Sequence, residues 1–295
     1  MKEKLEFRKL REFGDLIGDT IVFIRQNFKP LMKAIFSFCG IFIIGSIISM
    51  VIQKMAIPTP NPYNYSFWDT MSGIMFTWQY LMLIVFSVLN YTAIYVTVLS
   101  YISIYINKGN VAPTIDEIWA YFKYYFLRMF GSLFTMSLFL ILCFALCFFP
   151  GVYMFPSFCI FFPIMILENG SFSYSFGRSY TLLKDEWWIT AAVIFIIYAI
   201  TFAATFIVQI PVFVLRIIET ISHLKGANPF NLTYSAIEAI FTHLAQILMI
   251  IPIICSALIY FNLVERKESS GLLGRIEGLG KNFNTPPTES IPEEY

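Results

Sequence analysis

Four polar side chains stand inside stretches of this chain that contain no Lys, Arg, Asp or Glu. They are Asn90, Gln209, His243 and Gln246. Amides and imidazoles donate and accept hydrogen bonds, and polar side chains inside membrane spans usually face the interior of a helix bundle. Two roles follow from this chemistry. The side chains either hydrogen-bond between helices, or they line a path for a small solute.

The other reactive side chains form no catalytic or metal-binding pattern. The two histidines, His223 and His243, lack carboxylates at ligand spacing, because Glu238 precedes His243 by five residues and falls on another helix face. All five cysteines lie in apolar stretches, where small buried thiols are ordinary. No phosphate-binding loop, nucleophile elbow or dinucleotide fingerprint occurs. We therefore expect no enzyme, no metal and no cofactor.

Basic residues interleaved with apolar ones form a second group, placed just before predicted membrane spans. Ile17, Ile21 and Ile24 recur at helical spacing beside Arg25. A helix of this kind lies in the headgroup plane, where each basic residue adds about 1 kcal/mol of attraction to anionic lipid. The alternative is a collar that only fixes the tilt of the spans. The candidate lipid- or partner-binding residues are Arg8, Lys9, Arg11, Ile17, Ile21, Ile24, Arg25, Lys123, Arg178 and Lys184.

The elements that carry these residues are predicted to be membrane-spanning helices. Charged residues make up 13% of the chain and hydrophobic ones 58%, with a mean hydropathy of +0.70, whereas soluble domains carry about 25% charge. A bilayer core takes about 20 apolar residues per helix, and the Met129–Leu167 stretch is expected to fold back at Pro150-Gly151. The sequence predicts an all-α polytopic protein with six transmembrane helices, Leu31–Gln53, Met75–Ile106, Gly131–Phe149, Gly151–Leu167, Trp187–Val208 and Ala239–Leu263.

The distribution of positive charge predicts the orientation. With both termini on one side, 17 of the 20 Lys and Arg residues lie on that side, and only Lys54, Arg216 and Lys225 lie opposite. Cytoplasmic loops carry the excess of Lys and Arg, so we expect a plasma (inner) membrane protein with cytoplasmic termini. The same rule favours one long helix in Thr70–Asn107 over two short spans.

Three similar segments precede the first, third and fifth spans and predict an internal repeat of an interfacial helix plus a two-span hairpin. The alternative is that basic-aromatic borders before membrane spans look alike in general. The predicted organisation is a cytoplasmic amphipathic arm (1–30), a membrane domain (31–264) with repeat units near 15–107, 113–168 and 174–265, and a polar tail (265–295) whose Pro- and Glu-rich end favours disorder. The segments read DLIGDTIVFIRQNF from Asp15, PTIDEIWAYFKYYF from Pro113 and YSFGRSYTLLKDEW from Tyr174.

Four short motifs resemble the glycerophosphoryl diester phosphodiesterase membrane-domain-like group of multi-span bacterial proteins, whose function is largely uncharacterised. The resemblance covers about Phe7 to Gly280 and includes no catalytic residue. Some relatives fuse this membrane part to a soluble phosphodiesterase barrel; this chain has no room for that barrel and lacks a paired His site, so the resemblance implies no such activity. The motifs are PGVYM at Pro150–Met154, Glu168-Asn169-Gly170, SFGRSYTLLKDEWW at Ser175–Trp188 and YFNLVERKESSG at Tyr260–Gly271.

These patterns predict a non-enzymatic membrane scaffold or accessory protein that binds lipids or other membrane proteins through its interfacial helices. The alternative is a transporter or permease-like carrier of a small solute or lipid that uses the amides inside the membrane. A lipid-modifying enzyme ranks last, because no cluster of His, Asp or Glu stands at the interface. The expected partners are membrane lipids and, as a further candidate, another membrane protein. A net charge of +1 gives no reason to expect nucleic acid.

Overall fold

The structure, a computed structural model, describes residues 5–56, 75, 77–146, 148–224 and 232–269. Within that part of the chain every regular element is a helix, and six helical segments are long and apolar enough to cross a membrane. The predicted all-α, six-span class is therefore confirmed. The six segments are Phe13–Met55, Trp78–Asn107, Ile115–Leu146, Phe148–Leu167, Trp187–Ile218 and Leu232–Glu268.

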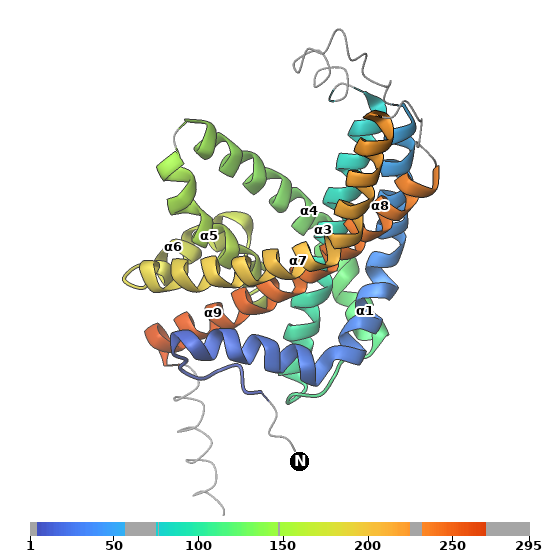
Figure 1. Cartoon of the computed structure of the whole chain (residues 1–295). Helices are drawn as coiled ribbons and strands as arrows, with labels where there is room; N and C mark the ends of the chain where they lie inside the picture. The colour runs from blue at the N-terminus through green and yellow to red at the C-terminus, as the bar shows by residue number, and fades with distance from the viewer. Residues whose placement is uncertain (1–4, 57–74, 76, 147, 225–231, 270–295) are drawn as a thin grey trace, which may run out of the picture.

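Helix α1 (Phe13–Ala56) joins most of the predicted arm and the first span into one helix of 44 residues. At 1.5 Å per residue such a helix is about 66 Å long, roughly twice the thickness of a bilayer core. Pro30 lies inside it, where a missing N–H and a steric clash favour a kink. In Figure 1, α1 runs along the base of the molecule and then turns upward. The arm and the span are thus two directions of one helix.

The next three helices are α3 (Trp78–Asn107), α4 (Ile115–Leu146) and α5 (Phe148–Leu167). The expected single long span is present as α3. The expected fold-back is also present, but α5 begins at Phe148, so Pro150 lies in its first turn, where proline is tolerated. A Cβ added to Gly151 would lie 2.4 Å from the Phe144 ring. This glycine therefore serves close packing between α4 and α5.

The C-terminal part contains α6 (Phe172–Leu183), α7 (Trp187–Leu224), α8 (Leu232–Ala245), a short 3₁₀ helix η1 (Gln246–Met249) and α9 (Ile250–Glu268). The last span is thus broken near its middle. The structure does not confirm the internal repeat, because the first two interfacial segments continue into their spans as α1 and α4, whereas the third is a separate helix, α6. The tail beyond Ser269 lies outside the described residues.

The core is centred on α3, α5 and α9. Every side chain from Thr92 to Tyr105 of α3 is buried, and so is every one from Pro252 to Glu265 of α9.

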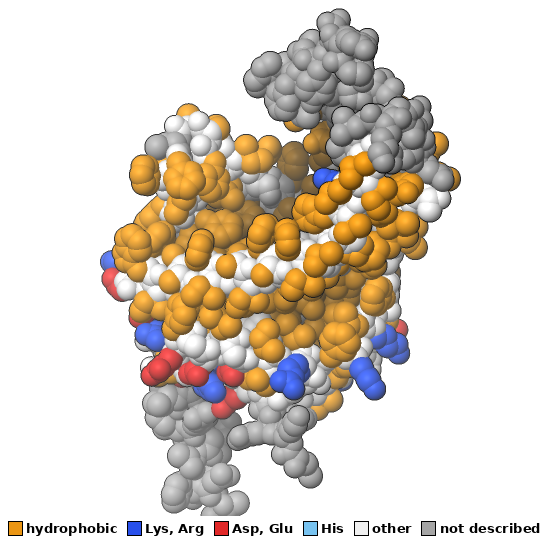
Figure 2. All heavy atoms as spheres, in the orientation of Figure 1, with side chains coloured by type: hydrophobic (Ala, Val, Ile, Leu, Met, Phe, Trp, Pro, Cys, Tyr) orange, Lys and Arg blue, Asp and Glu red, His pale blue; other side chains and the backbone are white. Residues whose placement is uncertain are grey.

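Figure 1 shows the α4–α5 hairpin splayed away from the upper parts of α3, α7 and α8. In Figure 2 the charged side chains gather mainly toward the lower end of the face shown, and hydrophobic ones cover most of the rest. That segregation is typical of a protein whose apolar belt faces lipid.

Candidate functional site

Three of the four polar side chains singled out in the sequence, Asn90, Gln209 and Gln246, meet at the break in the last span. Gln246 is the first residue of η1, and its Oε1 accepts a hydrogen bond of 2.5 Å from Nδ2 of Asn90 on α3. His243 lies three residues earlier, at the end of α8, and is 2% exposed. Gln209, from α7, lines the same pocket as Gln246. The fold therefore gathers residues that are up to 156 positions apart.

This pocket has a volume of about 340 Å³ and lies between α3, α7 and the α8–η1 break. Among the described residues no charged side chain lines it, and its polar groups are hydroxyls and amides, which both donate and accept hydrogen bonds. We call it the amide pocket. Its lining residues are Tyr91, Tyr198, Thr201, Phe202, Thr205, Gln209, Thr242, Ala245, Gln246 and Met249.

The polar wall of the amide pocket comes mainly from α7. Tyr198, Thr201, Thr205 and Gln209 follow one another at three- and four-residue spacing, which places them on one helix face. The Thr201 hydroxyl donates to the Ile197 carbonyl at 2.7 Å. Its oxygen therefore keeps acceptor capacity for another partner. This polar stripe could have been found in the sequence from its spacing alone, although only Gln209 was singled out there.

The break in the last span provides the other wall. Irregular backbone at membrane depth is tolerated only where protein buries it or where it lines a cavity, and η1 does the latter through Gln246 and Met249. Pro252 follows in the first turn of α9 and has no N–H to offer a helical hydrogen bond. A proline at this position favours a kink, and the irregular turn lies just before Pro252.

Two buried side chains beside the amide pocket keep unused hydrogen-bonding atoms. Within the described residues, Oδ1 of Asn90 has no hydrogen-bond partner, and the ring nitrogens of His243 make no well-aligned hydrogen bond although the ring lies beside the Gln246 amide. Leaving such a group unsatisfied costs about 1–3 kcal/mol, so native proteins rarely do so without a reason. Neither residue lines the amide pocket itself, but Asn90 bonds Gln246, which does.

An ion-pair cluster ties the spans together one turn away from the pocket. Glu238 precedes Thr242 by one turn of α8, and its side chain is 7% exposed. It accepts from Arg216 of α7 at 2.6 Å and from Lys54 of α1. The charge distribution placed Lys54 and Arg216 on the side opposite the termini, and neither was paired with Glu238. Their pairing could have been suspected, because Lys54 and Arg216 are two of the three basic residues assigned to the side opposite the termini.

Two of the candidate interfacial cations form ion pairs with carboxylates of the protein itself. Arg11 is 2% exposed and its Nε lies 2.9 Å from Oδ2 of Asp19, so it is not available to lipid phosphates as the sequence suggested. Arg178 bridges Glu168, at 3.3 Å, and Glu268. A basic residue in an amphipathic segment is thus not necessarily exposed to lipid. The spacing of residues within the segment does not show which carboxylate the fold brings to that residue.

The other candidates on the interfacial segments divide by exposure. Ile17 and Ile24 pack against the core while Ile21 is 38% exposed. The buried face of this part of α1 is instead formed by Leu16, Thr20, Phe23 and Asn27. The exposed cations are Arg8, Lys9 (3.7 Å from Asp19), Arg25, Lys123 (5.5 Å from the centre of the Trp119 ring) and Lys184.

Comparisons with protein-family models, with curated proteins and with solved structures find no match for this chain. The resemblance to the phosphodiesterase membrane-domain-like group therefore stays a prediction from short motifs.

Proposed function

We propose that this protein is a membrane carrier that binds a small, uncharged, hydrogen-bonding solute in the amide pocket. The observation that carries the proposal is the coincidence of three features: a cavity of about 340 Å³, a lining of amides and hydroxyls from three spans, and a broken span at the same place. Substrate sites in transporters are commonly built at discontinuous helices. A lining without charge favours neutral ligands such as polyols or amides, since an unpaired ion would lack a counter-charge there.

The scaffold function ranks second and is supported by different residues. Arg8, Arg25 and Lys123 are exposed on interfacial segments, and large apolar side chains such as Leu127 and Phe195 are exposed on α4 and α7. Such surfaces suit lipid or a partner helix equally. The engagement of Arg11 and Arg178 inside the protein reduces the basic surface available for that role.

We also propose a plasma-membrane location with both termini in the cytoplasm. The support is the asymmetry of Lys and Arg between the two sides of the predicted topology. Cysteine-specific labelling in intact cells tests the orientation: a cysteine at residue 60 should react with a membrane-impermeant maleimide, and a cysteine at residue 285 should react only after lysis. The opposite pattern would reverse the assignment.

The carrier proposal is tested by solute flux into proteoliposomes. The purified chain is reconstituted, and entry of small polyols and amides is followed by stopped-flow light scattering. At least one solute should enter at a saturable rate above that of protein-free vesicles. Gln246→Leu and Thr205→Val should reduce that rate, by up to about tenfold if one hydrogen bond of about 1 kcal/mol or more is lost.

Thr135→Val is the matched control for Thr205→Val. Thr135 is exposed on α4, and its hydroxyl already bonds the Gly131 carbonyl of its own helix, so flux should be unchanged. Absence of saturable entry for every solute tested would reject the carrier proposal. Recovery of a stoichiometric membrane protein with the chain in native lipid particles, lost in Ile21→Ser, would then favour the scaffold.

A further inference from the structure

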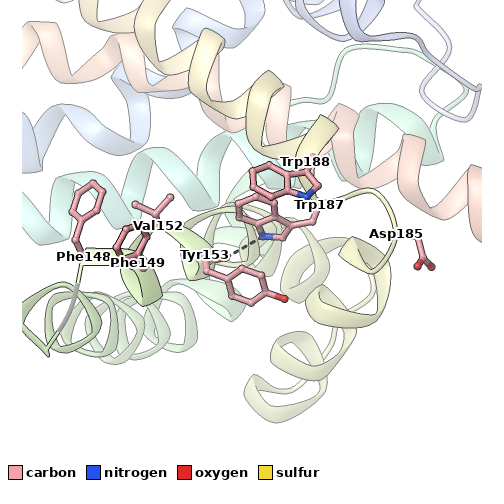
Figure 3. Close-up of a pocket in the computed structure, with 7 residues that line it drawn as sticks. All are labelled: Phe148, Phe149, Val152, Tyr153, Asp185, Trp187 and Trp188. Atoms are coloured by element: carbon pink, nitrogen blue, oxygen red, sulfur yellow. Dashed lines mark hydrogen bonds between the residues drawn. The ribbon is translucent and has the colours of Figure 1, made fainter.

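A second cavity, larger than the amide pocket, lies between the N-terminal turns of α5 and α7. It has a volume of about 670 Å³, and Figure 3 shows Tyr153 close to Trp187 and Trp188, with Phe148, Phe149 and Val152 to one side of them. Nε1 of Trp187 donates to the Tyr153 carbonyl at 3.1 Å, and the two rings stack at 5.3 Å. We call it the aromatic pocket. Its lining residues are Phe148, Phe149, Val152, Tyr153, Asp185, Trp187 and Trp188.

A polar cavity of about 420 Å³ adjoins the aromatic pocket. The two share Tyr153, Asp185 and Trp187, so they lie side by side, and we treat the first as the apolar part and the second, which has more polar side chains, as the polar part of one site. The polar part adds Ser157 of α5 and, at the end of α6, Tyr180, Thr181, Leu183 and Lys184.

The charges around the polar part favour an anion. Lys184 is exposed and forms no ion pair with any described residue. Lys267 adds a second cation, because its Nζ donates to the Thr181 carbonyl. Of the residues that the structure describes, only Asp185 brings an opposing charge to the lining, and in Figure 3 its carboxylate stands apart from the aromatic rings and points away from them. Its positive φ of 76° places it in the turn between α6 and α7.

We propose that this amphipathic cavity binds one phospholipid with an anionic headgroup. The acyl chains lie against the exposed rings of the aromatic pocket, and the headgroup phosphate lies at Lys184. Trp187 and Trp188 directly follow the charged Lys184-Asp185-Glu186 turn, and tryptophans at such a boundary mark the headgroup level of a membrane. A lipid fits this space better than a protein segment does, because apolar rings line one cavity and the Lys184 ammonium lies at the adjoining one.

The site is independent of the amide pocket. The two cavities share no lining residue, so the lipid site and the carrier function can fail separately.

Contact quenching by brominated lipids tests the proposal. A protein that keeps Trp187 as its only tryptophan, with Trp68, Trp78, Trp119 and Trp188 replaced by Phe, is reconstituted in phosphatidylcholine vesicles. Dibrominated phosphatidylglycerol is added in rising mole fraction, and dibrominated phosphatidylcholine is used in a parallel series. Half-maximal quenching should need about fivefold less of the anionic lipid, as expected from about 1 kcal/mol for one basic residue near the surface.

Variants then assign the preference to Lys184. Lys184→Gln should remove it and Lys184→Arg should keep it. Lys29→Gln, which removes another exposed lysine far along α1, should leave it unchanged. Equal quenching by the two lipids in the Trp187 protein, or an undiminished preference in Lys184→Gln, would overturn the proposal. Native mass spectrometry of the unmodified chain gives a reading that needs no variant: one phosphatidylglycerol should remain bound where phosphatidylcholine does not, and equal retention would count against the site.

Discussion

The backbone N–H of Arg11 donates to Oδ1 of Asn262 at 2.8 Å, across 251 positions of the chain. Nη2 of Arg266 donates in return to the Arg11 carbonyl at 3.3 Å. The segment before α1 is thereby fastened to α9, the most buried part of the last span. The rings of Phe7 and Phe261 meet in the same place, with centroids 5.5 Å apart.

Replacing Asn262 with Leu should destabilise the protein by about 1–3 kcal/mol, because the Arg11 N–H would stay buried without an acceptor. Thermal unfolding in detergent, followed by circular dichroism, should show a lower midpoint. Asn107→Leu is the matched control, since Asn107 is exposed at the end of α3. An equal midpoint in the two variants would show that the fastening contributes nothing.

Arg11→Gln should cost about 3–5 kcal/mol, the range for removing one partner of a buried ion pair. Asp19 would lose its closest cation, and the Phe7 carbonyl would lose a donor at 2.6 Å. Arg8→Gln, on an exposed side chain, should change stability by less than about 0.5 kcal/mol. Urea titration in mild detergent distinguishes the two. A small effect of Arg11→Gln would mean that this arginine reaches solvent.

A double-mutant cycle on Lys54 and Glu238 should give a coupling free energy of about 0.5–3 kcal/mol. Glu238→Gln alone should be the most damaging of the set, because it removes the carboxylate that both Lys54 and Arg216 contact. The unfolding free energies of the wild type, Lys54→Gln, Glu238→Gln and the double variant provide the measurement. Additive effects would indicate that the pair is screened by water.

Tyr174 should contribute to stability in a pH-dependent way. Its hydroxyl donates to Oε2 of Glu168 at 2.7 Å, and this bond raises the pKa of the Tyr174 phenol. A raised pKa means that the contribution is complete below the unfolded value of about 10 and disappears as the pH rises through the folded value. The stability difference between the wild type and Tyr174→Phe should therefore be constant up to about pH 10 and shrink above it. A difference that grows at high pH would contradict this sign.

The sequence predicted the spans well because long charge-free stretches leave the backbone no alternative to helix within lipid. The single helix of α3 and the hairpin of α4 and α5 followed from charge counting and from Pro150. The continuity of α1 could not be predicted as readily. A proline is typical of a boundary between two elements, so Pro30 predicts that the arm and the span are separate. The helix nevertheless continues through Pro30, because both of its parts pack against the rest of the protein.

The polar sites were predicted in part. Asn90, Gln209, His243 and Gln246 stood out because each is costly in an apolar helix, and three of them do meet. Two contacts of the basic residues were missed because the partners are far away in the sequence: Asn262, which accepts from the Arg11 backbone N–H, and Glu268, which pairs with Arg178. The buried stripe on the first half of α1 was misjudged for a related reason: it contains Thr20 and Asn27, and Asn27 accepts a hydrogen bond from Tyr101 at 3.0 Å.

The single helix α1 makes the N-terminal segment sensitive to bilayer thickness. A span adapts to a thinner or thicker bilayer by tilting, and the upright part of α1 is continuous with the part that lies along the base, with Pro30 between them. The part along the base carries Asp19, the partner of Arg11, whose backbone N–H contacts Asn262. We therefore expect a change in bilayer thickness to act through α1 on the contacts between the N-terminal segment and the last helix.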